Sequence, residues 1–154
     1  MLSIEQLIAL ASSAGFSGPD LATAVSIALA ESGGNPQAYN PERAAGAAQG
    51  KGSYGLWQIY ISAHPEYSAA QLLDPAYNAV AAFAVYQAAG SSFRPWSTFI
   101  NGAYMAHLDN VNAAISAPSQ DAGAGSSGFD PSGGQMAGLL LGGAVLFFVL
   151  TRYL

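Results

Sequence analysis

Glu31 is the residue whose place in the sequence most directly suggests chemistry. It lies at the C-terminal end of a predicted helix over residues 19–32, which is otherwise almost uncharged. Pro19 suits the first helical turn, and Gly33 and Gly34 suit the exit. An apolar wall and the negative end of the helix dipole both favour the protonated carboxyl, so we expect its pKa to be raised. Such a group is suited to protonate the leaving oxygen of a glycosidic bond.

Two short motifs in this order carry a family resemblance. Residues 31–36 run Glu-Ser-Gly-Gly-Asn-Pro, and residues 55–58 run Gly-Leu-Trp-Gln. Together they resemble the lytic transglycosylase branch of the lysozyme-like superfamily, over roughly residues 3–116. The resemblance implies that Glu31 is the sole catalytic acid and base, and that Gln58 lines the saccharide groove opposite it. It also implies a small lysozyme-like domain of the all-α, mainly helical class.

Two further family elements are matched more loosely. An asparagine followed by a small residue and a tyrosine on one helix corresponds to Asn78, Ala82 and Tyr86, although alanine stands where glycine is common. The tyrosine that the family places near Asn-Ala-Gly has its counterpart in Tyr104, within residues 99–104. These positions extend the resemblance along the chain.

Several polar and aromatic residues are candidates for contact with a sugar. Neutral amides among apolar residues need defined partners, because a buried unpaired polar group costs about 1–3 kcal/mol. We expect the amides to orient Glu31 or the sugar, and the tyrosines to supply stacking or hydroxyl contacts. One candidate, the serine after Glu31, is equally suited to capping its helix. The predicted substrate-binding residues are Ser32, Tyr54, Gln58, Asn78, Tyr86 and Tyr104.

The remaining elements follow from periodicity and capping signals. Residues 3–14 predict an amphipathic helix that opens with a capping box of Ser3 and Gln6. Residues 33–52 are rich in glycine and proline and predict a loop, and residues 53–61 a short hairpin. Two more helices are predicted, one from the cap at Asp74 to about Gly90 and one over residues 104–115. Core packing is expected for Trp96 and Phe83.

Composition limits the possible functions. The chain has 154 residues, 51% of them hydrophobic and only 8% charged, and its net charge is −5. Four lysine and arginine residues offer no basic stripe, which argues against nucleic acid as a partner. There is no cysteine, and the two histidines have no metal-ligand spacing. We therefore expect neither a metal nor a cofactor.

The chain divides into three parts by composition. Residues 1–116 form the predicted catalytic domain, and residues 117–135 are a tether rich in glycine, serine and proline. Residues 136–154 are almost wholly apolar and would span roughly 28 Å as a helix, barely enough to cross a bilayer. We expect this segment to be a transmembrane-like anchor; the alternative is a buried helix that docks on another protein.

The sequence thus predicts an enzyme that cleaves the β-1,4 bond between N-acetylmuramic acid and N-acetylglucosamine in peptidoglycan. The domain resembles virion-associated murein-degrading proteins of bacteriophages, which implies a virion location, with membrane or virion proteins as partners of residues 136–154. One alternative is a muramidase that uses water, with Glu42 or Glu66 as the base, because Asp74 looks like a helix cap. Another is a non-catalytic virion protein that only binds glycan.

Overall fold

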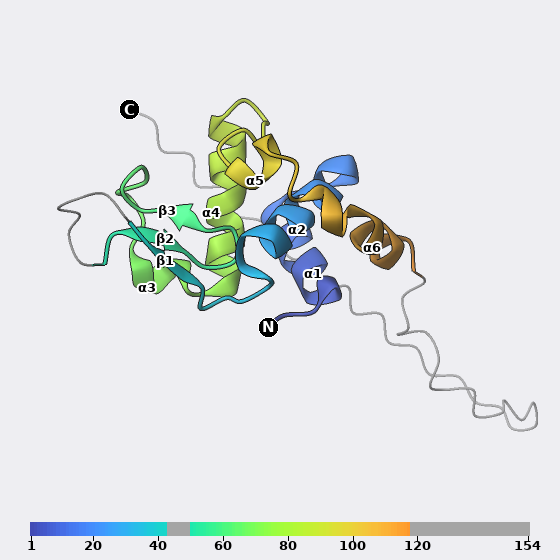
Figure 1. The fold of residues 1–154 in the computed structure, drawn as a ribbon, viewed down its shortest axis with the longest axis horizontal. Helices are drawn as coiled ribbons and strands as arrows, with labels where there is room; N and C mark the ends of the chain where they lie inside the picture. The colour runs from blue at the N-terminus through green and yellow to red at the C-terminus, as the bar shows by residue number, and fades with distance from the viewer. Residues whose placement is uncertain (43–49, 118–154) are drawn as a thin grey trace, which may run out of the picture. The chain divides into compact units, whose positions relative to one another are not determined.

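The computed structural model describes residues 1–42 and 50–117. Within them the chain is mainly helical and carries one small antiparallel sheet (Figure 1). The elements are α1 (Ile4–Ala14), α2 (Gly18–Ser32), β1 (Tyr39–Pro41), β2 (Gly52–Tyr54), β3 (Ile59–Tyr60), α3 (Ala69–Leu72), α4 (Pro75–Ala88), α5 (Ser97–Ile100) and α6 (Met105–Ser116).

The predicted capping signals are present where the sequence places them. Ser3 accepts from the backbone N–H of Gln6, and the Gln6 side chain accepts in turn from the backbone of Ser3, which completes the capping box of α1. At α4, the Asp74 carboxylate accepts from the backbone N–H of Tyr77 at 2.7 Å. These local bonds satisfy amide groups that a helix start leaves unpaired, and they confirm the predicted starts of both helices.

Helix α2 is the central element of the domain. Six of its residues are buried, from Ala22 to Ala28, as its apolar sequence predicts. It packs against α1, α5 and α6, while α1 also packs on α4. Glu31 therefore sits near the end of a helix that is fixed on several sides.

The sheet runs β1–β2–β3 with antiparallel pairing throughout. In the register, Asn40 is opposite Ser53, and Ser53 is opposite Tyr60. The hairpin predicted over residues 53–61 is confirmed, but the prediction of a loop through residues 33–52 is wrong at β1. Proline is tolerated there because the strand lies at an edge of the sheet. The all-α prediction therefore holds only as mainly α.

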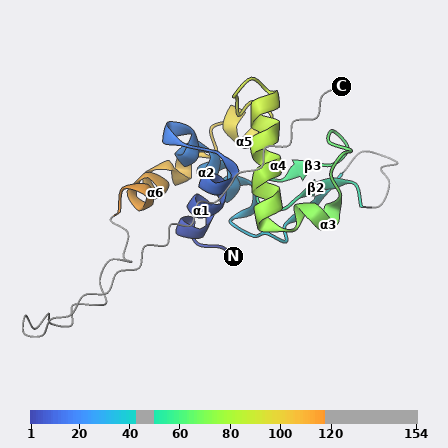
Figure 2. The same ribbon diagram turned by 180° about the vertical axis from the view of Figure 1, so that it is seen from behind.

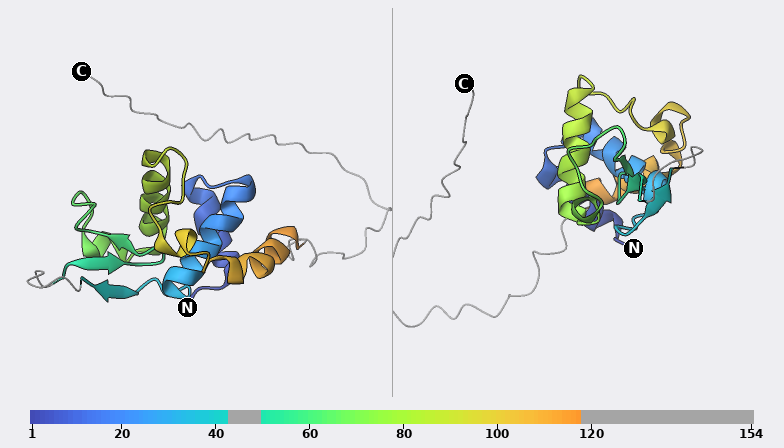
Figure 3. Two further views of the ribbon diagram at one scale, coloured as in Figure 1. Left: turned by 45° about the horizontal axis from the view of Figure 1, so that its top comes forward. Right: turned by 90° about the vertical axis from the view of Figure 1, so that its left-hand side faces the viewer.

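Helix α4 separates the sheet from the other long helices. Figure 1 shows the sheet and α3 on the left and α1, α2 and α6 on the right, with α4 between them. The view from behind shows α4 along the back of the domain (Figure 2). The short helix α5, which the sequence did not predict, lies beside α2 (Figure 3). The sheet therefore lies on one side of α4, and helices α1, α2 and α6 lie on the other.

The predicted tail lies almost entirely beyond the described part of the chain. The tether over 117–135, apart from Ala117, and the apolar segment over 136–154 both fall outside the described residues. Within residues 1–42 and 50–117, none of the helices combines the length and apolar character needed to cross a bilayer.

Candidate active site

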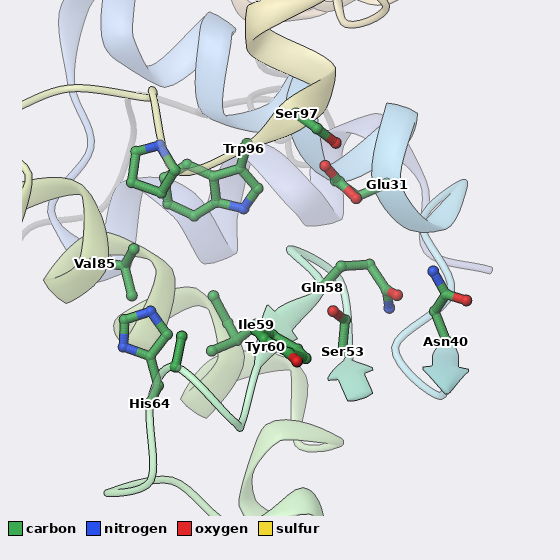
Figure 4. Close-up of a pocket in the computed structure, with 12 residues that line it drawn as sticks. Glu31, Asn40, Ser53, Gln58, Ile59, Tyr60, His64, Val85, Trp96 and Ser97 are labelled. Carbon is green, nitrogen blue, oxygen red and sulfur yellow. The ribbon is translucent and has the colours of Figure 1, made fainter. Parts of the chain in front are cut away.

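A cavity of about 360 Å³ opens between α2 and the sheet, and Glu31 forms part of its wall (Figure 4). Its size lies toward the lower end of the range of roughly 300–1,000 Å³ typical of small-molecule sites. The lining residues come from α2, all three strands, the turn before β3, the segment after β3, α4, and the start of α5 with the two residues that precede it. They are Glu31, Asn40, Ser53, Gln58, Ile59, Tyr60, Ala63, His64, Val85, Pro95, Trp96 and Ser97.

Burial raises the pKa of the Glu31 carboxyl above its ordinary value, in the predicted direction. Desolvation is the larger influence, because removing water from a carboxylate disfavours its charged form. A hydrogen bond from Thr98 partly opposes it: the Thr98 hydroxyl donates to Oε1 of Glu31 at 2.8 Å. The backbone of Thr98 adds a second hydrogen bond that also lowers the pKa of Glu31.

The turn over Gly55–Gln58 forms the side of the cavity opposite Glu31. Gly55 has a φ of +75°, and a Cβ at this position would collide with the Leu72 carbonyl and the Asn78 side chain. Only glycine fits this conformation and this close approach. Gln58 also has a positive φ, +48°, and its Nε2 donates to the carbonyl of Gly55 at 2.9 Å. The backbone thereby fixes the amide that faces Glu31 in Figure 4.

Asn78 holds this turn from beneath and does not line the cavity. Its side chain is 0% exposed. Its Oδ1 accepts from the backbone N–H of Trp57 at 2.9 Å, and its Nδ2 donates to the carbonyls of Tyr54 and Leu72, both at 3.0 Å. All three bonds go to the backbone, so Asn78 positions the turn.

Two tryptophans join the parts of the site to each other. The indole N–H of Trp57 donates to the Ala24 carbonyl of α2 at 2.9 Å. The indole N–H of Trp96 donates to the Trp57 carbonyl at 2.8 Å. Trp96 is buried, as expected, and it also forms a wall of the cavity beside Pro95. The helix of Glu31, the Gly55–Gln58 turn and the start of α5 are therefore bonded in series.

Ser32 acts as a cap at the end of α2. Its Oγ donates to the Ala28 carbonyl at 2.9 Å and accepts from the backbone N–H of Gly34 at 3.2 Å. Of the two roles that the sequence leaves open, the structure shows the capping role.

The three predicted tyrosines lie outside the lining of the cavity. The Tyr54 hydroxyl donates to the Gly50 carbonyl at 2.7 Å, and its ring stacks on Tyr39. The Tyr86 hydroxyl donates to Oδ2 of Asp20 at 2.6 Å, which ties α4 to the first turn of α2. The Tyr104 ring stacks on Phe99 with centroids 5.2 Å apart. Their observed contacts are with the protein.

Several residues of the site were not predicted from the sequence. The row Asn40, Ser53 and Tyr60 crosses all three strands and lines the cavity, because directly paired residues point to the same face of a sheet. The sequence did not show that β1 pairs with β2, and this pairing is what places the three residues in one row. Thr98 and His64 carry no local motif, and their roles depend on contacts made far along the chain.

Among the described residues that line the cavity, Glu31 alone carries a carboxyl group. The other acidic candidates do not line the cavity and have partners of their own. Oε2 of Glu42 accepts from the Ser62 hydroxyl at 2.9 Å, and hydrogen bonds from Tyr60 and Ser62 hold the pKa of Glu42 below its ordinary value. Glu66 is 57% exposed beside His64, and Asp74 caps α4. No group of three or more metal-ligating side chains occurs within the described part of the chain.

Comparison with known proteins gives one match. The sequence model of a family described as a lysozyme-like domain matches residues 8–98, more than half of the chain. This range includes Glu31, the Gly55–Gln58 turn and Thr98. No curated protein and no solved structure matches the chain.

Proposed function

The chain belongs to the lysozyme-like domain family, and from this premise we propose that it is a lytic transglycosylase of peptidoglycan. The family supports cleavage of glycosidic bonds in peptidoglycan. The finer proposal is that Glu31 alone acts as acid and then as base on the bond between N-acetylmuramic acid and N-acetylglucosamine.

One observation carries the proposal. Glu31 is a half-buried carboxyl with a raised pKa on the wall of a cavity to which the other described lining residues add no second carboxylate. Glycosidases of the two-carboxylate type place both groups across the scissile bond. A single acid fits a reaction in which the substrate supplies its own nucleophile.

The proton transfers balance with one carboxyl group. The Glu31 carboxyl gives its proton to the glycosidic oxygen as the bond from that oxygen to C1 of the muramoyl residue breaks. The C6 hydroxyl of the same residue attacks C1, and its proton passes to the Glu31 carboxylate. The product is a 1,6-anhydro-muramoyl end, and Glu31 is again protonated. Thr98 and the tryptophan bonds keep the carboxyl oriented through both steps.

The test is release of soluble fragments from purified murein. Glu31→Gln keeps the size of the side chain and removes the transferable proton, so we expect release to fall to background. Glu5→Gln is the matched control, because Glu5 lies exposed in the first turn of α1. Full release by Glu31→Gln would overturn the assignment of the acid.

We also propose that residues 136–154 attach the enzyme to a membrane or to a virion protein. The support is their apolar composition and the resemblance to phage murein-degrading proteins. The full chain should partition into lipid vesicles, and a chain ending at Ala117 should not. Equal partitioning of the two chains would contradict the membrane form of this proposal.

A further inference from the structure

Helix α5, which supplies Thr98, has little of its own to hold it in place. It is four residues long, and none of them is buried. Its main neighbour among the described elements is α2. A single helical turn is not stable in water by itself, because starting a helix costs more free energy than one turn returns. The position of Thr98 must therefore be fixed by a residue next to α5.

Trp96 is the buried residue directly before α5, and only 5% of its surface is exposed. Its carbonyl accepts from the backbone N–H groups of Phe99 at 3.1 Å and Ile100 at 3.2 Å, which starts the helix. Its indole N–H donates to the Trp57 carbonyl at 2.8 Å. Figure 4 shows this indole on the wall of the cavity. Trp96 therefore both begins α5 and bonds it to the Gly55–Gln58 turn.

The Trp57 carbonyl is a fixed acceptor, because Trp57 is buried and is itself bonded to α2. Its indole N–H donates to the Ala24 carbonyl at 2.9 Å. Ala24 lies about two helical turns before Glu31 in α2. The hydrogen bonds thus close a ring that runs from α2 to Trp57, on to Trp96, and from Thr98 back to α2 at Glu31.

Thr98 meets the Glu31 carboxyl with two donors. Its hydroxyl donates to Oε1 at 2.8 Å, and its backbone adds a second hydrogen bond. Both act against burial, because a donor stabilises the ionised carboxylate. The direction of the backbone donor depends on where the chain lies and not on the Thr98 side chain. The residue that fixes the start of α5 therefore also controls this second donor.

We propose that Trp96 is a positioning residue for Glu31: its indole bond to Trp57 holds the backbone N–H and the hydroxyl of Thr98 against the carboxyl group. Trp96 acts here through Thr98, and this role does not require its indole to touch the sugar. The inference rests on the proposed function for the role of Glu31 as the acid. It adds that the affinity of the acid for its proton depends on a hydrogen bond between two other residues.

Other titratable groups lie around α2, and their side chains are not part of this ring. Among the described residues, none of them forms a side-chain hydrogen bond with Trp96 or Thr98. Helix α5 has no titratable residue. Loss of the indole bond should therefore act on Glu31 through Thr98. The other groups are Tyr60 and His64 in the lining of the cavity, Glu5 in α1, Asp20 in α2 itself, and His107 and Asp109 in α6.

Titration of the Glu31 carboxyl carbon by nuclear magnetic resonance tests the proposal without relying on activity. The full chain has four glutamates, so carbon-13 labelling of glutamate gives a simple spectrum in which Glu31→Gln identifies the signal. Trp96→Phe removes the indole N–H. Replacement of Trp96 by benzothienylalanine is the closer match, because it keeps the double ring and puts sulfur in place of the N–H.

Both replacements should raise the pKa of Glu31, because the carboxylate loses donors while it stays buried. In a Thr98→Val background, Trp96→Phe should raise this pKa again, because the backbone donor is still present there to be lost. The rate constant kcat on murein should fall about tenfold in each Trp96 variant. Thermal melting separates this effect from a loss of stability, since a substitution that only weakens the fold lowers the melting temperature without moving the titration.

Tyr39→Phe is the matched control. The ring hydroxyl of Tyr39 donates to the Lys51 carbonyl at 3.1 Å, so this variant also loses a bond from an aromatic side chain to the backbone, at a residue that does not line the cavity. The pKa of Glu31 should keep its wild-type value. An unchanged or lower pKa of Glu31 in both Trp96 replacements would overturn the proposal, and so would the absence of a further rise in the Thr98→Val background.

Failure of the enzyme proposal gives a different pattern. If the wild type releases no murein fragments while both Trp96 replacements still raise the pKa of Glu31, Trp96 positions the carboxyl and the catalytic proposal fails. If murein is cut normally and the titration of Glu31 does not respond to Trp96, the positioning proposal fails and the catalytic proposal stands.

Discussion

The hydroxyl of Thr98 donates a 2.8 Å hydrogen bond to Oε1 of Glu31, across 67 positions in the sequence. The bond links α5 to the end of α2. It also acts on the pKa of Glu31 in the direction opposite to burial, because a donor stabilises the ionised carboxylate. Thr98 is thus a positioning residue with a measurable electrostatic effect.

Thr98→Val should remove this bond while keeping the shape of the side chain. We expect kcat on murein to fall about tenfold or more, because the carboxyl loses its fixed orientation. The lost donor should raise the pKa of Glu31 further, so the alkaline limb of the pH–rate profile should move to higher pH. Thr23→Val, on the exposed side of α2, is the matched control. A shift of that limb to lower pH would contradict the assigned role.

Glu31→Gln should change stability in a way that depends on pH. Below the ordinary pKa of glutamate, the group is protonated in both the folded and the unfolded chain, so the change should matter little. As the pH rises through the raised pKa of the folded state, the wild type must bury a charge and loses stability. The variant should therefore melt at a higher temperature than the wild type at pH 8. This difference in melting temperature should disappear as the pH is lowered.

Glu5→Gln gives the opposite expectation in the same assay. A hydrogen bond with Ser3 holds the pKa of Glu5 below its ordinary value, so its ionised form favours the folded state. This variant should melt slightly lower than the wild type at pH 8. If the difference in melting temperature between Glu31→Gln and the wild type does not change with pH, the burial of the Glu31 carboxyl is contradicted.

Asn78→Ala should destabilise the fold strongly. It leaves the N–H of Trp57 and the carbonyls of Tyr54 and Leu72 without their partner, each at a cost of about 1–3 kcal/mol. The free energy of unfolding, measured with urea, should fall by about 3 kcal/mol or more. Asn112→Ala, on the exposed face of α6, should change it by less than about 0.5 kcal/mol. Near-wild-type stability of Asn78→Ala would show that Asn78 does not hold the turn.

Ser26→Ala should stabilise the protein. Ser26 is 0% exposed in the middle of α2, and its hydroxyl has no hydrogen-bond partner among the described residues. Removing a buried unpaired hydroxyl and adding the better helix former should raise the free energy of unfolding by about 1 kcal/mol. The same change at exposed Ser12 of α1 controls for helix propensity. A less stable Ser26→Ala variant would show that the hydroxyl is paired.

Features that depend on local sequence were predictable. The caps at Ser3 and Asp74, the apolar helix before Glu31 and the Gly55–Gln58 turn were all read from neighbouring residues, and the structure has them. Burial of Glu31 followed from the same kind of reasoning, since its helix has almost no polar face.

Features that depend on distant contacts were not predictable. β1 is recognisable only when paired with β2, so the row that crosses Asn40 and Ser53 was missed. Thr98 bonds to Glu31 across 67 positions, and the nearby Trp96 bonds to the Gly55–Gln58 turn, so neither contact follows from neighbouring residues. Asn78 was expected beside the substrate because an amide in an apolar helix needs partners, but the backbone supplies all of them.

Mass spectrometry of the murein fragments released by the full chain tests the central claim most directly. If Glu31 works without a second carboxylate and the C6 hydroxyl is the nucleophile, the fragments should end in 1,6-anhydro-N-acetylmuramic acid, lighter by one water than reducing ends. Fragments with ordinary reducing ends would mean that water attacks C1, and would contradict the single-carboxyl mechanism.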